Sequence, residues 1–171
     1  MPNKVVVVDY DDKPIRVIEK MEAHKKPTLH RAFSVFLYNK NKVLLQKRAL
    51  NKYHSGGLIA NTCCSHPQLN EDIIENAKTR LIEELNIKVD SLKEVGTFVY
   101  FHKFNENLYE YEYDHVLAGY FDGEYEMNPE EVCWIGWVDI EEVKKDIIDN
   151  PNNYAVWFIT AFQIFLKEMK L

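Results

Sequence analysis

The stretch NEDIIENAKTRLIEEL, residues 70–85, marks the point where the sequence changes from strand patterns to a helix pattern. Its apolar residues recur at the spacing of one helix face: Ile74, Ala77, Leu81 and Leu85. Acidic residues stand at its start, as is typical of a helix N-terminus, so a helix is predicted to begin near Asn70. Strand-like segments lie on both sides of it. This order favours an α+β fold with a mixed β-sheet.

Outward from this helix, three pairs of apolar runs are each divided by a short polar turn, which is the pattern of antiparallel strand pairs. The predicted pairs are 5–10 with 15–19, 31–38 with 43–48, and 95–104 with 109–120. A short run at 58–60, a strand at 133–138 and two helices at 140–148 and 154–169 complete the predicted elements. The last helix is apolar on most sides, so we expect it to be largely buried.

Length and charge narrow the class of protein. A chain of 171 residues fits one domain, and residues 1–171 are expected to form it, with an N-terminal extension of about 1–29 packing on the core. The net charge of −6 argues against general nucleic-acid binding. Three cysteines do not form a disulfide framework, which favours a cytoplasmic location. Neither a secretory signal nor a membrane span is expected, and hence no membrane partner.

The segment NTCCSHP, residues 61–67, concentrates reactive side chains. From the residues alone, Cys63, Cys64 and His66 could hold a metal, attack a substrate or move protons. Neighbouring residues of a strand-like segment point to opposite sides, so only one thiol can face a cleft. Cys64 shares the parity of His66 and is the expected one, whereas Cys63 is expected to pack in the core. A metal-bound histidine and a following helix N-terminus would favour the thiolate of Cys64.

Three histidines and two strand carboxylates could form a metal site. His24, His30 and His66 lie near the edges of predicted strands or loops, and Glu110 and Glu112 share one face of a predicted strand. Nitrogen and oxygen ligands of this kind suit a divalent ion such as Zn²⁺ or Mn²⁺ with five or six ligands. The simpler alternatives are hydrogen-bonded histidines and a solvated face of alternating glutamates.

Charged residues near the helix at 70–85 allow two interpretations. Arg80 and Glu84 are one helical turn apart, which is the spacing of a surface ion pair. Alternatively, Arg80 contacts an anionic substrate while Glu84 holds Mg²⁺, an ion that prefers oxygen ligands and substrate phosphates. Basic residues cluster around the predicted strand pair at 31–48 and would suit a diphosphate in this otherwise acidic protein: Lys20, Lys47, Arg48 and Lys52.

Taken in order, these motifs resemble those of type I isopentenyl-diphosphate Δ-isomerase, an enzyme family with the Nudix fold. The resemblance spans nearly the whole chain and rests on His24, HRAF at 30–33, KRAL at 47–50, NTCCSHP at 61–67, FVY at 98–100, EYE at 110–112, NPEEV at 128–132 and a tryptophan in the last helix. It implies a Nudix-type α/β/α sandwich with a mixed β-sheet, additional N-terminal strands and a C-terminal helix. The Nudix box is incomplete, since Ser65 and Asn86 replace its usual glycines and Thr79-Arg80 replaces its Arg-Glu pair. This departure weakens a hydrolase assignment.

The resemblance also implies residue roles. The ligands of a Zn²⁺, Mn²⁺ or Mg²⁺ ion would be His24, His30, His66, Glu110 and Glu112. Glu84, with the backbone carbonyl of Cys64, would hold a Mg²⁺ that also binds the diphosphate. Residues in contact with that diphosphate would be Lys20, Arg48, Lys52 and Arg80. The proton carriers would be Cys64 and Glu112, with Tyr100 hydrogen-bonded near Glu112. The indole of Trp157 could stabilise a cation through its π face or, equally, pack in the core.

The expected function is therefore interconversion of isopentenyl and dimethylallyl diphosphate in isoprenoid biosynthesis, through a tertiary carbocation and without a redox cofactor. The substrate is a small-molecule diphosphate, and the protein is expected to be a monomer or a weak homodimer. One alternative is a Nudix hydrolase that acts on a nucleoside or other diphosphate. The other is a non-catalytic sensor of a diphosphate ligand, which would have lost the thiol or the ligand carboxylates.

Overall fold

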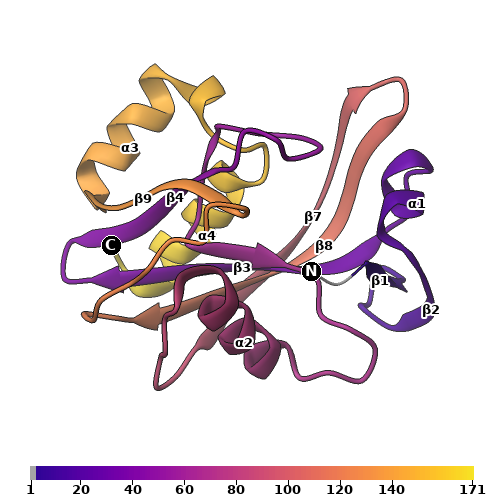
Figure 1. Cartoon of the computed structure of the whole chain (residues 1–171), viewed down its shortest axis with the longest axis horizontal. Helices are drawn as coiled ribbons and strands as arrows, with labels where there is room; N and C mark the ends of the chain where they lie inside the picture. Colours follow the sequence, from indigo (N-terminus) through magenta and orange to yellow (C-terminus); the bar gives the residue numbers. More distant parts are fainter. Residues whose placement is uncertain (1–2) are drawn as a thin grey trace.

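The computed structural model describes residues 3–171, in which a nine-stranded sheet is flanked by helices (Figure 1). The strands are β1 (Lys4–Val8), β2 (Pro14–Glu19), β3 (His30–Asn39), β4 (Lys42–Arg48), β5 (Ile59–Ala60), β6 (Cys63–Ser65), β7 (Lys93–Asn105), β8 (Leu108–Tyr120) and β9 (Val132–Asp139). The helices are α1 (Lys20–Lys25), α2 (Ile73–Leu85), α3 (Ile140–Asp149) and α4 (Phe158–Met169), with a 3₁₀ turn, η1, at Pro151–Asn153.

Strand β3 is the centre of the sheet. It runs parallel to β8 along its length and antiparallel to β6, and its C-terminal end forms a hairpin with β4. On its other edge, β8 pairs with β7, and the two form a long antiparallel hairpin. Strand β4 also pairs with β9 and β5. At the N-terminus, β1 pairs with β2 and meets β3 where Val7 lies opposite His30. The expected mixed sheet is confirmed.

The two faces of β3 are buried against different helices, as Figure 1 shows with α2 on one side of the sheet and α4 on the other. Phe33, Val35 and Leu37 pack with the apolar face of α2. Phe36 points the other way, against the aromatic face of α4. A strand covered on both faces is apolar at successive positions, which explains the continuous run seen in the sequence. The expected α/β/α sandwich is confirmed.

Helix α2 begins and ends at recognisable caps. It starts at Ile73, three residues later than expected, because the side chain of Asp72 accepts a hydrogen bond from the backbone N–H of Glu75 at 3.0 Å. It ends at Asn86, which adopts the left-handed conformation with φ of 53°. A glycine is usual at such a C-terminal position, and asparagine is the next most tolerant residue. Asn86 therefore does the conformational work of the glycine that it replaces.

Two expectations about helices are wrong. The last helix begins at Phe158 and not at Tyr154, because residues 151–153 form a 3₁₀ turn and Tyr154 makes a parallel bridge with Ile59. His24 does not lie at a strand or loop edge but on α1, a helix that the sequence did not predict. Six residues are too few to establish a helical period. Over residues 3–171, no helix is long and apolar enough to span a membrane.

The N-terminal segment, which contains β1, β2 and α1, packs beside β8, on the right of Figure 1. Val6, Val8 and Leu29 form a small apolar cluster with the rings of Tyr111 and Tyr113. These two tyrosines occupy the face of β8 opposite to its buried carboxylates. The cluster holds α1 against β8, which brings Lys20 and His24 to the functional site described next.

Candidate active site

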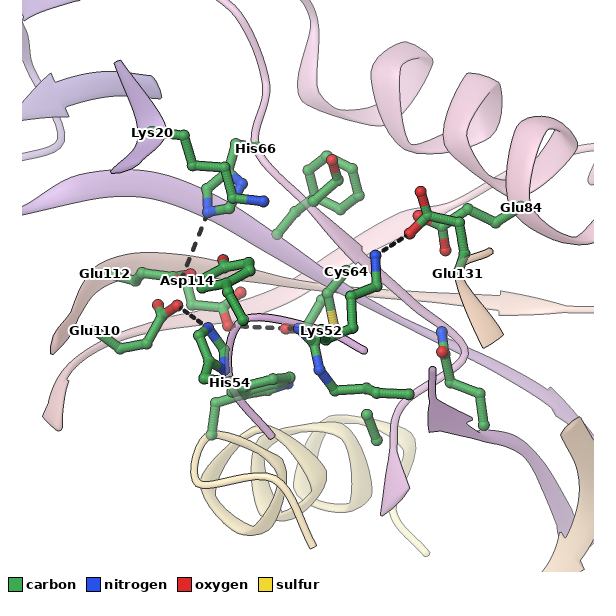
Figure 2. Close-up of a pocket in the computed structure, with 18 of the residues that line it drawn as sticks. Lys20, Lys52, His54, Cys64, His66, Glu84, Glu110, Glu112, Asp114 and Glu131 are labelled. Carbon is green, nitrogen blue, oxygen red and sulfur yellow. Dashed lines mark hydrogen bonds and ion pairs between the residues drawn. The ribbon is translucent and has the colours of Figure 1, made fainter. Parts of the chain in front are cut away.

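Strand β8 carries three buried carboxylates on one face. Glu110, Glu112 and Asp114 alternate along it and are at most 7% exposed, so the solvated-face alternative is wrong. They line a cavity of about 670 Å³ including the space open to solvent, which lies between β8, the β4–β6 region and the start of α4 (Figure 2). Buried carboxylates are retained where they are hydrogen-bonded, paired with a charge or bound to a metal.

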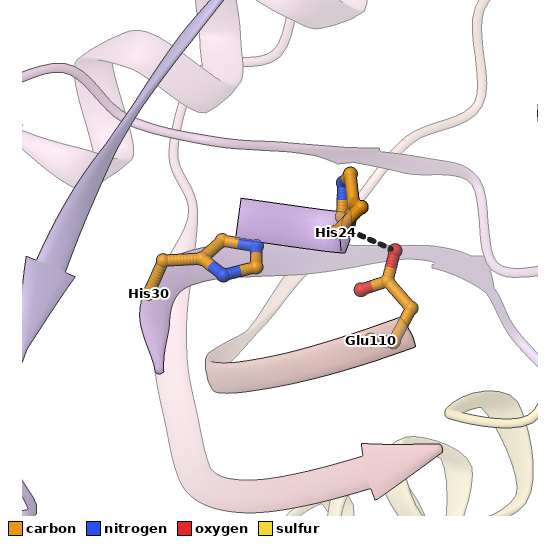
Figure 3. A group of neighbouring side chains, drawn as sticks. All are labelled: His24, His30 and Glu110. Atoms are coloured by element: carbon orange, nitrogen blue, oxygen red, sulfur yellow. Dashed lines mark ion pairs between the residues drawn. The ribbon is translucent and has the colours of Figure 1, made fainter. Parts of the chain in front are cut away.

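The five expected metal-ligating residues come together, and three of them, His66, Glu110 and Glu112, line this cavity. His24, His30 and Glu110 form one group, shown in Figure 3, and His30, His66 and Glu112 form another. In each group the candidate ligand atoms lie within 4.8 Å of one another. The histidines arrive from three places in the chain: α1, the first residue of β3, and the residue after β6. His30 belongs to both groups, so the two form one continuous cluster.

The histidines are in the form that a metal requires. The Nδ1–H groups of His24 and His30 donate to the carbonyls of Tyr109 (2.9 Å) and Thr28 (2.8 Å), so the lone pair of each ring is on Nε2, which in His24 meets the hydroxyl of Tyr53. Within residues 3–171, Nε2 of His30 and of His66 are buried without a hydrogen-bond partner. Burial lowers the pKa of His24 to about 4 and the pKa values of His30 and His66 below their usual range. Neutral imidazoles with orphaned nitrogens fit a divalent cation.

Glu110 supplies the negative charge of the cluster. Burial raises the pKa of Glu110. The hydrogen bond from His54 and the nearby imidazoles lower it by more, so the net shift of the pKa is downward and favours the ionised carboxylate. Nε2 of His54 lies 2.5 Å from Oε1 of Glu110, and the hydroxyl of Tyr53 lies 3.1 Å from Nε2 of His24. Sequence reasoning missed both Tyr53 and His54. They lie in an irregular loop, where no periodicity indicates which side chains point inward.

The two cysteines separate as their parity predicts. Cys64 lines the cavity, and its thiol donates to Oδ1 of Asn61 at 3.1 Å. Cys63 is fully buried on the other side of β6, in the cluster that contains α2.

The surroundings of Cys64 do not favour the expected thiolate. Burial, followed by the charge of Asp114, raises the pKa of Cys64 to about 12, and Arg48 and Asn61 offset only part of this shift. Helix α2 does not begin until Ile73, so its N-terminus gives no help. These surroundings favour the protonated thiol of Cys64.

Trp157 packs in the core, as one interpretation expected, and it also lines the cavity, while its role towards a cation stays a prediction. It is 4% exposed, and its Nε1–H donates to Oδ1 of Asn61 at 3.0 Å. The same oxygen therefore accepts from Cys64 and from Trp157. The guanidinium of Arg48 lies over the indole, 5.3 Å from the ring centre, which is a cation–π distance. The indole face can thus accommodate a positive charge inside the cavity.

Tyr100 bonds a carboxylate two residues from Glu112 on the same strand face. Its position on β7 is opposite Glu112 in the strand register, but its hydroxyl donates to Oε2 of Glu110 at 3.2 Å. A long aromatic side chain can reach the diagonal neighbour on the adjacent strand, which sequence register alone does not reveal. Asp114 was also missed as a site residue: its Oδ2 accepts from Ser34 at 2.8 Å, and burial raises its pKa to about 7.

Three of the four expected diphosphate contacts line the cavity. Lys20, Arg48 and Lys52 do so, and Lys52 also pairs with Glu131 (Figure 2). Burial lowers the pKa of Lys20 to about 8, which is the strain expected of a cation kept out of water without a full counter-charge. These three residues form a basic rim on a cavity whose floor is acidic.

Arg80 is not among the residues that line the cavity. It bonds Glu84 through Nη2 and Glu83 through Nη1, each at 2.5 Å. The Arg80 and Glu84 side chains are 6% and 5% exposed, so this is a buried pair and not the surface pair of the simpler interpretation. Glu84 itself lines the cavity with Glu131, and burial raises its pKa although Arg80 opposes the shift.

The fold and this site define a class of protein. Residues 28–158 match the NUDIX domain family, to which the chain therefore belongs. The fold is also similar to that of a Deinococcus radiodurans protein, with a TM-score of 0.69 and 19% identity over 86% of this chain and 90% of that one. The MutT protein of Methanosarcina mazei gives a TM-score of 0.66 and 16% identity over 84% and 96%.

Closer relatives define the branch of that family. The chain is 42% identical to isopentenyl-diphosphate Delta-isomerase 2 of Aromatoleum aromaticum over 92% of this chain and 83% of the relative. It is 45% identical to isopentenyl-diphosphate Delta-isomerase 2 of Photorhabdus laumondii over 92% and 89%. Within the NUDIX family, the chain belongs with the isopentenyl-diphosphate Delta-isomerases.

Proposed function

We propose that this protein interconverts isopentenyl diphosphate and dimethylallyl diphosphate in isoprenoid biosynthesis. The observation that carries the proposal is that the thiol of Cys64 and the carboxylates of Glu110 and Glu112 face one buried cavity. Moving a terminal double bond inward requires one group that adds a proton to the terminal carbon. It also requires a second group that removes a proton from the CH₂ on the other side of the branched carbon. The names of the relatives at about 40% identity support the same chemistry.

Two cation sites are part of the proposal. The His24, His30, His66, Glu110 and Glu112 cluster would hold one divalent ion, Zn²⁺, Mn²⁺ or Mg²⁺, and Glu84 with the carbonyl of Cys64 would hold a Mg²⁺ shared with the diphosphate. The orphaned Nε2 atoms of His30 and His66 support the first site. The bound ions would supply positive charge that anchors the diphosphate and polarises the carboxylates.

The diphosphate would bind at the basic rim formed by Lys20, Arg48 and Lys52. Arg80 was expected to share this role, but it does not line the cavity and it pairs with Glu84. We therefore assign Arg80 to holding Glu84 in place. A phosphate group is best bound by charge-assisted hydrogen bonds, which Arg48 and the two lysines can donate.

The hydrocarbon part of the substrate would lie between Cys64, Glu112 and Trp157. Cys64 and Glu112 are the proposed proton carriers, and they exchange roles in the reverse reaction. Both are largely screened from water, which would otherwise trap the tertiary cation. The π face of Trp157 would stabilise that cation by about 2 kcal/mol when it is desolvated. Tyr100 would hold the carboxylate of Glu110, next to the reacting centre.

Two other functions have less support. A Nudix hydrolase would be expected to carry the Arg-Glu pair where this chain has Thr79-Arg80, and here Arg80 places a cation beside Glu84. A non-catalytic diphosphate sensor has no need of a thiol and carboxylates buried in one cavity. We also propose a cytoplasmic monomer or weak homodimer without a nucleic-acid or membrane partner. The net charge of −6 and three unpaired cysteines support that setting.

The test is a product assay on purified protein with isopentenyl diphosphate and Mg²⁺, which follows dimethylallyl diphosphate and released phosphate together. The wild type should form the isomer and release no phosphate. Cys64→Ala should lose at least about a thousandfold in rate, on the scale of losing an acid–base group. The matched control, Cys63→Ala, should stay within about fivefold of the wild type, because Cys63 does not line the cavity and its thiol makes only a long bond, 3.5 Å, to Oε2 of Glu84. Phosphate release without the isomer would refute the proposal and favour a hydrolase.

A further inference from the structure

Three consecutive residues of the loop between β4 and β5 each contact a different group of the site. Lys52 pairs with Glu131, the hydroxyl of Tyr53 meets Nε2 of His24, and His54 meets Glu110. His54 lies outside the sequence motifs that indicate the site. Its side chain is nonetheless buried, at 7% exposure, and Figure 2 shows it beside Glu110, with its ring directed at the carboxylate.

The neighbours of His54 fix both its orientation and its tautomer. Its ring stacks on Phe104 with 4.4 Å between ring centres and an interplanar angle of 12°. Nδ1 lies 3.0 Å from the hydroxyl of Ser55, which can donate to it, and Nε2 lies 2.5 Å from a carboxylate oxygen, which can only accept. The proton is therefore on Nε2, and His54 donates to Glu110.

Glu110 is held at both oxygens by donors from different parts of the chain. Oε1 accepts from His54 on the loop, and Oε2 accepts from Tyr100 on β7. A carboxylate fixed at both oxygens cannot rotate about its terminal bond, so its remaining lone pairs keep one direction. Residues that orient a metal ligand in this way typically contribute about 10- to 100-fold to metal affinity.

We propose that His54 is a positioning residue of the metal site: it holds the carboxylate of Glu110 in the orientation that completes the cluster with His24 and His30. His54 acts through Glu110 and is not itself a ligand or a catalytic residue. The inference rests on the proposed function, because it takes Glu110 to be a metal ligand. The loop between β4 and β5 thereby contributes to the metal site, because His54 affects how tightly the cation binds.

The test measures binding of Co²⁺ to metal-free protein by competition with a chromogenic chelator, together with the visible absorption of the bound Co²⁺. His54→Phe keeps the stacking on Phe104 and removes the donor, and should weaken Co²⁺ binding about 10- to 100-fold and change the spectrum. His54→Gln places an amide N–H where Nε2–H was, and should recover affinity to within about threefold of the wild type. His54→Asn, too short to reach Glu110, gives a second loss variant if the Phe variant does not fold.

The matched control is His102→Phe, because His102 packs against the same Phe104 ring from β7, with 4.6 Å between ring centres. It should bind Co²⁺ within about twofold of the wild type. Wild-type affinity and spectrum in His54→Phe or His54→Asn would overturn the proposal. Equal losses in the Gln and Phe variants, or in His102→Phe, would also overturn it by showing a packing effect. A wild-type protein that binds no divalent ion would refute the proposed metal site, and the role of His54 with it.

Discussion

Asn61 is the residue whose replacement tests the site geometry most severely. Its side chain is fully buried and makes four hydrogen bonds: Nδ2 donates to the carbonyls of Cys63 (2.7 Å) and Val35 (3.2 Å), and Oδ1 accepts from Cys64 (3.1 Å) and Trp157 (3.0 Å). Through these four bonds, the Asn61 amide joins β3, β6 and the residue before α4. Replacement by alanine removes all four bonds and leaves their partners inside the protein.

The expected loss follows from the groups that are left unpaired. Counting only the two shortest bonds to nitrogen or oxygen, Asn61→Ala strands the carbonyl of Cys63 and the indole N–H of Trp157. Each buried unsatisfied group costs about 1–3 kcal/mol, so the free energy of unfolding should fall by about 4 kcal/mol. The thiol of Cys64 also loses its acceptor, so the isomerisation rate should fall in variants that remain folded.

The assay is urea-induced unfolding followed by tryptophan fluorescence, with Asn51→Ala as the control because Asn51 is exposed. The control should change the free energy of unfolding by less than about 0.5 kcal/mol. A loss below about 1 kcal/mol in Asn61→Ala, at an unchanged dependence on urea, would refute the reasoning, because the four bonds would then contribute no more than a surface contact.

Three further predictions concern the same framework. Asn86→Ala should lower the free energy of unfolding by about 1 kcal/mol, because alanine is disfavoured at a φ of 53°, whereas Asn86→Gly should not; equal values for the two in urea unfolding would contradict this. Arg80→Ala should lower the free energy of unfolding by about 3–5 kcal/mol, because it leaves Glu84 buried without this partner. Lys78→Ala, which breaks a partly exposed pair with Glu75, should lower it by less than about 1 kcal/mol. Similar losses for both variants would contradict the burial argument. Adding Mn²⁺ or Zn²⁺ to chelator-treated protein at about 100 times its dissociation constant should add about 2.7 kcal/mol and raise the thermal midpoint by roughly 5–10 °C, and an unmoved midpoint would contradict the metal site.

Much of the fold could be predicted from the sequence because strong periodic patterns specify it. The β7–β8 hairpin, the central strand pair and α2 were each within a few residues of the observed bounds. The alternation of Glu110, Glu112 and Asp114 predicted one shared face, and parity separated Cys64 from Cys63. These predictions succeed because a side chain's direction on a strand depends only on its place in the period.

The features that were missed depend on irregular backbone or on diagonal reach. His24 lies on a six-residue helix, and His54 lies in a loop, so neither has a period that reveals its direction. Tyr100 was expected near Glu112 by family resemblance, and its bond to Glu110, the diagonal neighbour in the strand register, has no signal in the sequence. The raised pKa of Cys64 follows from its burial in the folded protein, which no local pattern encodes.

The central claim is that groups inside the cavity add a proton to one carbon of isopentenyl diphosphate and remove a proton from another. The most direct measurement is the reaction in D₂O, with the product analysed by mass spectrometry and NMR. Carriers equilibrated with solvent predict dimethylallyl diphosphate with deuterium in the methyl group formed from the terminal carbon, and no such product from Cys64→Ala. Isomer formed without solvent deuterium, or equally fast by Cys64→Ala, would contradict the account.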